Sequence, residues 1–509
     1  MLQAESFRPI VEGFARTDEE LYIQEIPNAG AWEFLAANVP LFECPDRVMQ
    51  EVYYFRWWTF RKHIRGTEQG LVLTEFLAPV RHAGVHNTIS CALGHQIAEG
   101  RWLADRSILD QYVHFWLRGE GGQPQGHLHK YSSWLAHALW GRRCVDGRAA
   151  FEVDLLDDLA ADYHVWEAER LGSDGLFWQY DVRDGMEESI SGSRTARNVR
   201  PTINSYMYAN AVALAAIAGA AGRREVAAEF AAKAERLKDL VQAHLWDEEA
   251  RFFKVRLEGD GLADARELLG YTPWFVGLPD GGYEEAWRQL TDEGGFAAPF
   301  GPTTAERRHE KFVVATSGGD DCQWNGPSWP FSTAVTLVAL ANVLNDYRQD
   351  VMTRADYMAV LNTYAASHRL KRDDGTVVYW IDEDLHPFTG TWLTRERKLA
   401  KAKARGETFA ERGKDYNHST FCDLVITGLV GLRPRADSTV EVNPLAPAEW
   451  EHFCLDGVGY HGRTLTIVWD RTGQRYGRGA GLAILADGRE IARRGDLGRL
   501  SGVLRPASE

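Results

Sequence analysis

The 509-residue sequence is poor in cysteine and has no uncharged apolar run long enough to span a membrane. Its six cysteines are widely scattered, with neither a CxxC pair nor zinc-like spacing: Cys44, Cys91, Cys144, Cys322, Cys422 and Cys454. The first residues, Met1 to Ser6, contain no basic head followed by an apolar run, so we expect no secretory signal. These absences predict reduced thiols and a soluble, cytoplasmic protein.

The sequence also lacks an excess of basic residues. It has 57 Lys and Arg against 72 Asp and Glu, a formal net charge of −15, which disfavours binding to nucleic acid or to an anionic membrane. We find no GxGxxG, P-loop, GxSxG or HExxH motif, which argues against dinucleotide-binding, nucleotide-hydrolysing, serine-esterase and zinc-protease functions. Aromatic residues are abundant, with 18 Trp, 18 Tyr and 22 Phe. Such rings stack on sugars in carbohydrate clefts, but they also fill protein cores.

From about residue 47 to 433, apolar residues recur mostly at helical spacing. After Pro201, an apolar face continues through Met207, Ala211, Leu214 and Ala218, and Gly222 ends it. Later helices are expected at about 331–346, 353–368 and 417–430. The helices come in pairs without βαβ alternation, which argues against doubly wound and TIM-barrel folds. The pattern predicts a mainly α fold, an (α/α)6 toroid or six-hairpin barrel, with a cleft formed by loops at one rim.

The two ends of the sequence have a different pattern from the helical region. After Pro434, short alternating or apolar runs and the turn Asp487-Gly488 predict β-strands joined by hairpins. Residues 1–45 contain Pro27, Gly30 and Pro40 and are expected to form an extended arm around the barrel. We therefore predict an N-terminal arm (1–45), a catalytic barrel (46–433) and a small C-terminal β-sandwich (434–509).

A first candidate segment, 177–189, holds four carboxylates within eight residues beside aromatic side chains: Asp181, Asp184, Glu187 and Glu188. A glycosidase needs one carboxyl that stays protonated near neutral pH, and burial or a neighbouring negative charge supplies this condition. The alternative is a helix N-terminus in which acidic residues are favoured by the helix dipole.

A second candidate segment is a loop rich in Gly and Pro that runs directly into a predicted helix. Trp324 and Trp329 offer stacking faces, and Gln323 and Asn325 can bracket sugar hydroxyls. The pair Asp320-Asp321 suggests calcium, but no DxDxDG spacing follows it. The alternative is a tight structural turn with buried tryptophans.

A third candidate segment, 377–392, carries the acidic triple Asp382-Glu383-Asp384 close to Trp380 and Trp392. One of these carboxylates is suited to activate a water molecule. The alternative is an exposed acidic hairpin.

These three segments, in this order, resemble the clan of trehalase and glycoside hydrolase family 63. The likeness is strongest to the small bacterial mannosylglycerate/glucosylglycerate hydrolase type. Its general-acid motif S-G-(Met/Arg/Trp)-Asp-x-S corresponds to Asp184–Ser189, where Glu187 stands at the acid position. Its W-x-G-P-x-W-P motif is matched by Trp324–Pro330, and its general-base motif corresponds to Glu383–Gly390. The family's W-D pair is replaced by His86-Asn87.

The resemblance implies an exo-acting, inverting glycoside hydrolase that cleaves short α-linked glycosides and is similar to an α-glucosidase. Glu187 would be the general acid, with Asp184 as its rival, and Glu383 the general base. The candidate substrate-binding residues are Trp57, Asn87, Arg194, Gln323, Trp324, Asn325, Trp329, Trp392 and His418. No cofactor or metal is expected. The partner is a small saccharide or glycoside, with an acidic aglycone as one option, and a homo-oligomer is compatible with the relatives.

Three other functions stay open. The first is an α-L-rhamnosidase or L-arabinofuranosidase, because the tail after residue 434 resembles the β-domain of other six-hairpin glycosidases. The second is a sugar isomerase or 2-epimerase, which would move protons with paired histidines drawn from His127, His129 and His418. The third is a sugar-binding module that lost catalysis through the change from Asp to Glu at position 187.

Overall fold

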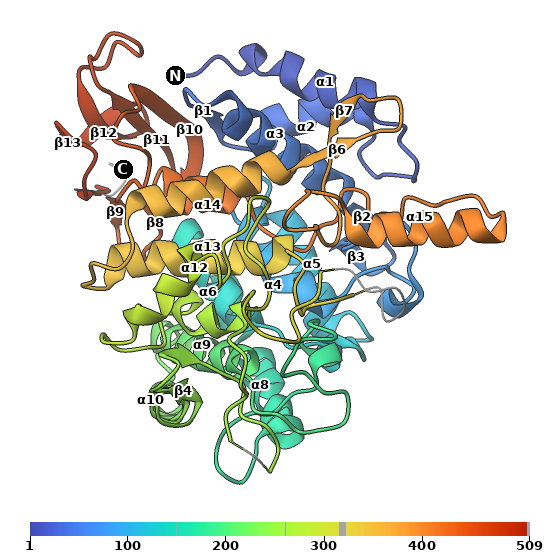
Figure 1. The fold of residues 1–509 in the computed structure, drawn as a ribbon. Helices are drawn as coiled ribbons and strands as arrows, with labels where there is room; N and C mark the ends of the chain where they lie inside the picture. Colours follow the sequence, from blue (N-terminus) through green and yellow to red (C-terminus); the bar gives the residue numbers. More distant parts are fainter. Residues whose placement is uncertain (149, 260, 315–321, 506–509) are drawn as a thin grey trace.

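The computed structural model describes residues 1–148, 150–259, 261–314 and 322–505, and it is mainly helical (Figure 1). Its α-helices are α1 (Arg8–Thr17), α2 (Ala31–Asn38), α3 (Arg47–Lys62), α4 (Ser90–Gly100), α5 (Ser107–Arg118), α6 (Leu135–Asp146), α7 (Ala150–Asp154), α8 (Leu156–Arg170), α9 (Pro201–Ala220), α10 (Arg224–Leu245), α11 (Thr272–Phe275), α12 (Arg288–Thr291), α13 (Pro330–Asp346), α14 (Arg354–Ser367), α15 (Leu393–Arg405) and α16 (Cys422–Leu424). Among these described helices, none combines the length and the apolar character that crossing a bilayer requires.

Six of the helices pack in a closed order. α4 contacts α6, α6 contacts α9, α9 contacts α11, α11 contacts α13, α13 contacts α16, and α16 contacts α4 again. Other helices pack against this ring: α8 and α10 lie against α9, and α14 lies between α13 and α3. α9 and α13 bury side chains on almost every face, whereas α10 buries a single stripe. The ring helices therefore form the core, and helices such as α10 separate it from solvent.

Most of the later helices lie where the apolar spacing predicts them. α9 begins at Pro201, and Gly222, with φ of +71°, lies in the turn before α10. α13 and α14 match the expected ranges 331–346 and 353–368. The range 417–430 is helical only from Cys422, where α16 leads into a π-helical turn at Val425–Leu429. Residue 417 is outside the helix because its backbone N–H donates to the carbonyl of Glu75, at 2.9 Å.

The strands after residue 431 form two antiparallel sheets, one of which includes a strand from the N-terminal segment. The strands are β1 (Leu41–Glu43), β8 (Leu432–Arg433), β9 (Thr439–Val442), β10 (His452–Tyr460), β11 (Arg463–Asp470), β12 (Gly481–Ala486), β13 (Arg489–Arg494) and β14 (Leu500–Val503). Their orders are β1-β10-β11-β12-β13 and β14-β9-β8. The predicted turn Asp487-Gly488 joins β12 to β13, and both residues have positive φ, as a two-residue hairpin turn requires.

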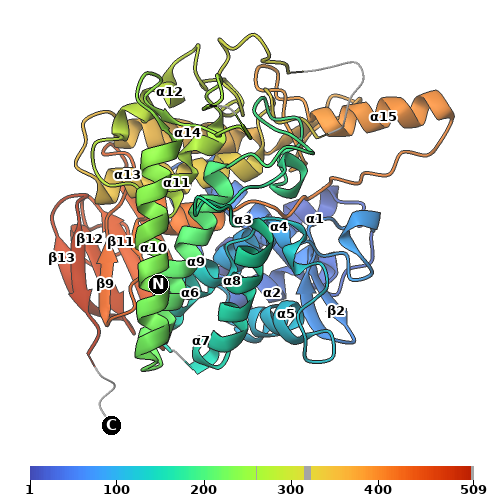
Figure 2. The ribbon, with the colours of Figure 1, turned by 90° about the horizontal axis from the view of Figure 1, so that it is seen from below.

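The remaining strands form three short hairpins in the connections between helices. They are β2 (Ile64–Thr67) with β3 (Gly70–Leu73), β4 (Trp246–Asp247) with β5 (Phe252–Phe253), and β6 (Arg369–Lys371) with β7 (Val377–Tyr379). The first and the third of these hairpins lead directly into segments that carry candidate site residues. α15 follows the third and projects away from the body of the molecule (Figures 1 and 2).

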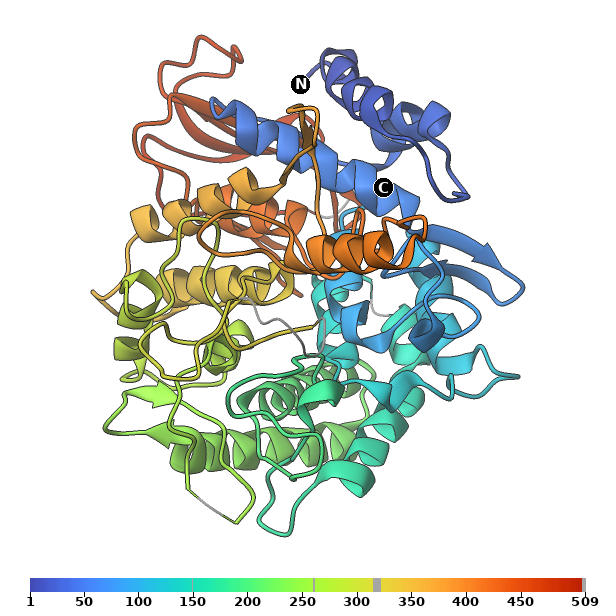
Figure 3. The same cartoon turned by 45° about the vertical axis from the view of Figure 1, so that its right-hand side comes forward.

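Residues 1–45 differ from the extended arm predicted for them. They contain α1 and α2, which bury Val11, Phe14, Trp32 and Leu35 and pack against α3. Figure 3 shows these two helices beside α3 at one edge of the molecule. Pro27 and Gly30 lie just before α2 and Pro40 lies just after it, so these residues mark the two ends of a helix and not an extended chain.

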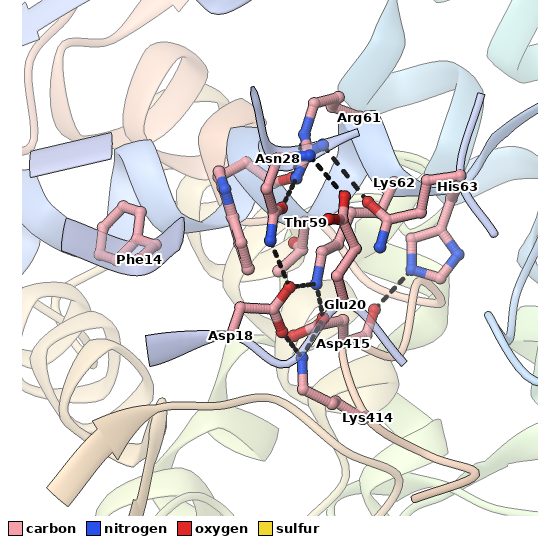
Figure 4. Close-up of polar contacts among 12 residues, drawn as sticks. Phe14, Asp18, Glu20, Asn28, Thr59, Arg61, Lys62, His63, Lys414 and Asp415 are labelled. Atoms are coloured by element: carbon pink, nitrogen blue, oxygen red, sulfur yellow. Dashed lines mark hydrogen bonds and ion pairs between the residues drawn. The ribbon is translucent and has the colours of Figure 1, made fainter. Parts of the chain in front are cut away.

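Four buried charges connect this N-terminal segment to the chain between α15 and α16 (Figure 4). Lys62, the last residue of α3, lies 2.8 Å from Asp18 and 2.6 Å from Asp415. Lys414 lies 2.8 Å from Asp415 and also pairs with Asp18. We call these four residues the charge tetrad. Because two cations alternate with two anions, the tetrad is neutral and each charge has two partners in place of water.

The charge tetrad fixes an unusual backbone conformation at Asp415, whose φ is +60°. Burial opposes the ionised carboxylate, but Lys414 and Lys62 outweigh burial and hold the pKa of Asp415 below its usual range. The backbone N–H of Asp415 donates to the carbonyl of Ile381 at 2.9 Å, and its own carbonyl lies 2.6 Å from Nε2 of His63. The chain around Asp415 is therefore held from several sides.

We predict that Asp18→Asn lowers the free energy of unfolding by about 3–5 kcal/mol, because it leaves two buried lysines with one carboxylate. The measurement is chemical denaturation followed by tryptophan fluorescence. Glu12→Gln is the matched control in the same segment, since Glu12 pairs with Arg8 in solvent and its loss should not be measurable. Equal stability of the two variants would contradict a structural role for the charge tetrad.

Candidate active site

A cavity of about 310 Å³ lies where the segments that precede five of the six ring helices meet. Three glutamates line it together with aromatic rings, two cations, two histidines and two thiols: Glu75, Glu187, Glu383, Phe76, Tyr131, Trp324, Trp329, Phe331, Tyr416, Lys398, Arg412, His82, His418, Cys91 and Cys322. The N-termini of α4, α6, α9 and α13 lie at this end of the ring, so their dipoles favour negative charge here.

A larger cavity of about 750 Å³ lies toward the opposite ends of the same helices, next to the later parts of α4, α6 and α13. Asp346 and Asp423 are the two carboxylates among the described residues that line it. Asp346 pairs with Arg433 at 3.0 Å, and Asp423 pairs with Arg101 at 2.7 Å. Because Glu187, Trp324, Trp329 and Glu383 of the three candidate segments line the smaller cavity and not the larger one, we assign the candidate active site to the smaller cavity.

Glu383 lies in the wall of the smaller cavity with both of its acidic neighbours buried. It is 1% exposed, and Asp382 and Asp384 are equally buried, so the acidic triple is not an exposed hairpin. Arg412 pairs with Glu383 at 3.1 Å, and Sγ of Cys322 lies 3.8 Å from its Oε2. Burial and the charge of Glu383 raise the pKa of Asp382 to about 8, and burial raises that of Asp384 to about 6. The guanidinium of Arg412 therefore fixes the position of the Glu383 carboxyl group in the cavity wall.

Glu187 and Asp184 lie in very different surroundings although three positions separate them. Glu187 is half-buried and lines the cavity, and its carbonyl accepts a hydrogen bond from the backbone N–H of Trp324, at 3.0 Å. The side chain of Asp184 is fully buried, and its Oδ2 lies 2.7 Å from Nε of Arg200. Thr202 donates a second hydrogen bond to the same oxygen. The structure therefore brings Glu187 to the cavity and leaves Asp184 behind the wall.

Two predicted aromatic residues and one predicted histidine line the cavity. The rings of Trp324 and Trp329 stack with centroids 4.5 Å apart at an angle of 10°. Nε1 of Trp329 donates to the carbonyl of Gln323 at 2.7 Å, which fixes the orientation of the indole. His418 lies against the ring of Tyr416, and burial holds its pKa well below the usual range. Both of its ring nitrogens are buried and have no hydrogen-bond partner among the described residues.

Three predicted binding residues lie away from the cavity. Trp57 is fully buried in α3, between Tyr53 and Phe60. Trp392 is also buried, and its Nε1 donates to the carbonyl of Arg369 at 2.9 Å. Both tryptophans fill the core.

Asn87 is the third of these residues, and it serves the backbone of its own loop. Its side chain accepts a hydrogen bond from the N–H of Val80 and donates to the carbonyls of Phe76 and Ala78, at 2.7–3.0 Å. Its φ of +56° lies in the left-handed region, which asparagine tolerates better than most residues. Asn87 therefore shapes the loop that carries Phe76.

The other three predicted binding residues are not among the described residues that line the cavity. Arg194 pairs in solvent with Glu188 at 3.2 Å. Gln323 is buried, and its Oε1 accepts from Arg397 at 3.0 Å. The carbonyl of Asn325 accepts from the N–H of Val313 at 3.0 Å.

Sequence reasoning missed Glu75, Arg412 and Tyr416. Glu75 lies two residues after the end of β3, and Oη of Tyr416 donates to its Oε1 at 2.7 Å. Arg412 and Tyr416 lie within six positions of the predicted His418, so the surroundings of that histidine were the available signal. Glu75 had no such neighbour in the sequence, because the fold brings it there from 341 positions away.

The remaining predictions concern metals and histidines. The described residues contain no group of three or more His, Cys, Asp or Glu side chains that could hold a metal ion. Asp320 and Asp321, the residues that suggested calcium, lie outside the described residues. Among the histidines considered for an isomerase, His418 lines the cavity, whereas His129 pairs with Asp162 at 2.7 Å.

A glutamate pair in an aromatic cavity is the kind of site that a glycoside hydrolase uses, and the comparison with known families agrees. Residues 85–419 match the mannosylglycerate hydrolase MGH1-like glycoside hydrolase domain, and residues 432–493 match the C-terminal domain of glycosyl hydrolase family 65. The chain belongs to the MGH1-like glycoside hydrolase family.

Three of the solved structures that are similar to this chain span most of its length. One named "Sialidase" is 44% identical over 100% of this chain, with a TM-score of 0.92, and this chain spans 45% of its length. A family 78 rhamnosidase of a Bacillus species is 14% identical over 88% of this chain and 41% of its own, with a TM-score of 0.55. A family 63 mannosylglycerate hydrolase from Thermus thermophilus, in complex with glucose, is 13% identical over 73% of this chain and 98% of its own, with a TM-score of 0.51.

We predict that Asp184→Asn lowers the free energy of unfolding by about 3–5 kcal/mol, because it leaves the buried guanidinium of Arg200 without its carboxylate. Glu187→Gln should leave it within about 1 kcal/mol of the parent protein, since the side chain is half-buried at the cavity wall. Both values come from denaturant titration. If Asp184→Asn leaves the free energy of unfolding unchanged, Asp184 would again be a candidate for the general acid.

Proposed function

We propose that this chain is an exo-acting, inverting glycoside hydrolase that cleaves short α-linked glycosides, as an α-glucosidase does. The observation that carries the proposal is that Glu187 and Glu383 line one small cavity, although 196 positions separate them in the sequence. Inversion needs one carboxyl to protonate the departing oxygen and another to activate a water on the opposite face of the sugar. Two carboxyl groups from different segments of the ring are suited to these two separate roles.

The surroundings of the two glutamates support separate roles. Glu383 is buried, pairs with Arg412 at 3.1 Å, and stands at the position of the family's general base. Glu187 is half-buried, lines the same cavity, and stands at the position of the family's general acid. We therefore assign Glu187 as the acid and Glu383 as the base. An inverting pair stands about 6.5–9.5 Å apart, which leaves room for water.

The size and charge of the cavity support a short substrate with an acidic aglycone as one option. A volume of about 310 Å³ holds little more than one or two sugar rings. Trp324 and Trp329 supply ring faces for stacking. Lys398 and Arg412 also line the cavity, and Lys398 lies on α15, whose residues Leu393–Arg405 include six Lys or Arg and one Glu. These cations attract an anionic group to a protein whose net charge is −15.

An α-L-rhamnosidase or L-arabinofuranosidase is the second candidate. The family 78 rhamnosidase structure aligns with 88% of this chain, against 73% for the mannosylglycerate hydrolase, so the rhamnosidase resembles more of the whole architecture. Asn87 in place of the family's acidic residue also favours a different sugar, because Asn87 is occupied by backbone groups. The substrate screen described below decides between these sugars.

The architecture belongs to the same proposal. We infer that α4, α6, α9, α11, α13 and α16 form the inner layer of an (α/α)6 toroid spanning residues 46–433, and that residues 434–509 form a small β-sandwich domain. The closed order of helix contacts and the helices packed outside the ring support the toroid. Residues 1–45 are then a helical segment that supports the barrel and adds β1 to the C-terminal sheet.

We predict that the protein releases a β-anomer first from an α-linked donor, because water attacks the face opposite the departing group. The measurement is time-resolved proton NMR on a pool of small α-glucosides, α-L-rhamnosides and L-arabinofuranosides, with free mannose included. The depleted donor identifies the sugar. Initial release of the α-anomer would contradict inversion, and conversion of mannose with every glycoside intact would favour the isomerase.

Glu187→Gln and Glu383→Gln should each lower turnover in this assay by about 10²–10⁴-fold, the range that general acid–base catalysis supplies. Glu188→Gln is the matched control, because Glu188 adjoins Glu187 but is exposed and pairs with Arg194. Turnover close to that of the parent protein in either of the first two variants would remove that residue from the mechanism.

A further inference from the structure

Glu75 is a third carboxyl group in the candidate active site, and the proposed reaction gives it no part. It is 4% exposed and lines the cavity with Glu187 and Glu383. It follows β3, in the connection between α3 and α4, and lies outside residues 85–419, which match the family domain. A carboxyl this deeply buried is expensive to keep charged, so its surroundings decide its protonation and its use.

The position of the Glu75 side chain is tightly fixed. Oη of Tyr416 donates to its Oε1 at 2.7 Å, and the backbone N–H of Asn417 donates to its carbonyl at 2.9 Å. The rings of Phe76 and Tyr416 lie 4.4 Å apart, which holds the phenol in place. Tyr416 adjoins Asp415 of the charge tetrad, so the same anchor that fixes this segment also fixes the partner of Glu75. One carboxyl oxygen is thereby engaged, and the other is available for a ligand in the cavity.

The charges around Glu75 disfavour its ionised form. The titratable and charged groups that face it are Glu383, Glu187, Arg412, Tyr416, Cys91, Tyr131 and Tyr112. Within the described part of the chain, no lysine or arginine forms an ion pair with Glu75, because Arg412 pairs with Glu383. Burial raises the pKa of Glu75 to about 8. The negative charges of Glu383 and Glu187 add to this effect, whereas the hydrogen bond from Tyr416 and the charge of Arg412 oppose it.

We propose that Glu75 is a sugar-binding residue, and that its neutral carboxyl group donates a hydrogen bond to a hydroxyl of the sugar held between Glu187 and Glu383. The proposal rests on the function proposed above and adds a residue that determines sugar affinity. A neutral acid presents one O–H donor and leaves the two working glutamates without a third negative charge beside them. A carboxylate in its place would accept hydrogen bonds only and would repel both. The inferred hydrogen bond to the sugar therefore requires one proton on Glu75, and it is lost when the pH rises above the pKa of that group.

The direct test is the protonation of Glu75 in the protein without ligand. Infrared difference spectra between pH 6.5 and 9.5 follow the loss of neutral carboxyl groups. We expect Glu75 and Asp382 to titrate near pH 8, and Glu152, whose pKa burial raises to about 7, to titrate below them. Glu75→Gln should remove one of the two signals near pH 8 and leave the others. If Glu75→Gln leaves both signals near pH 8, Glu75 is ionised at neutral pH and the proposal is overturned.

The second test is sugar affinity, with D-glucose and L-rhamnose as probes and tryptophan fluorescence as the signal. Because the pKa of Glu75 is about 8, its neutral fraction falls about tenfold between pH 7 and pH 9. The affinity of the parent protein should fall by the same factor relative to Glu75→Gln, whose amide donates at every pH. Glu75→Ala should bind about tenfold more weakly at pH 7 than the parent protein does. Asp382 is present in both the parent protein and Glu75→Gln, so its titration affects both affinities and cancels in their ratio.

The control is Glu68→Gln, an exposed glutamate in the turn of the same β2–β3 hairpin, which should keep the parent pH dependence. A constant affinity ratio across pH, or the absence of saturable binding of either sugar, would overturn the sugar-binding role. Neither result bears on Glu187 and Glu383, whose roles the NMR assay tests separately. Failure of this proposal and failure of the proposed function are therefore distinguishable.

Discussion

The candidate active site depends on a neutral set of four buried charges outside it. Lys62, Asp18, Lys414 and Asp415 hold the end of α3, the N-terminal segment and the chain between α15 and α16 at one point (Figure 4). Desolvation of four charges is costly, and the cost is met only if all four stay together. The four charges therefore stabilise the structure only as a complete set, and together they fix the backbone conformation of Asp415. Arg412, which precedes Asp415 in the sequence, and Tyr416 and His418, which follow it, all line the cavity.

The carboxyl groups near the cavity differ in the residues that they contact. Each carboxyl near the cavity is a glutamate or aspartate of the same chemistry, and the environment distinguishes them. Arg412 pairs with Glu383, Arg200 holds Asp184 in the core, and Tyr416 orients Glu75. Glu187 borders the cavity from a loop that is bonded to the tryptophan motif through the N–H of Trp324. In the function proposed above, an acid, a base and a sugar-binding group share this small space.

Much of the fold could be predicted because helices and hairpins are encoded locally. The run from Pro201 to Gly222, the helices at 330–346 and 354–367, and the turn Asp487-Gly488 each carry their signal within a few residues. The prediction failed for residues 1–45, where short apolar stripes on α1 and α2 were outweighed by prolines and a glycine. The prediction of a helix also failed at residues 417–421, because tertiary hydrogen bonds there replace the helical ones.

The site could be predicted where a motif carried it and not where the fold assembles it. Glu187, Glu383, Trp324 and Trp329, which belong to the matched motifs, line one cavity together with His418. Trp57 and Trp392 do not, because a tryptophan that stacks on sugar and one that fills a core have the same sequence signature. Glu75 has no signature at all, since its significance comes from Tyr416 and from the two other glutamates that the ring of helices brings beside it.

The most direct test of this account is a crystal structure of the protein with a bound sugar, in which the separation of the Glu187 and Glu383 carboxyl groups is measured. The account predicts a sugar in the smaller cavity, with the two carboxyls about 6.5–9.5 Å apart on opposite sides of it. A separation of about 5–5.5 Å would contradict inversion. A sugar bound in the larger cavity alone would contradict the assignment of the site itself.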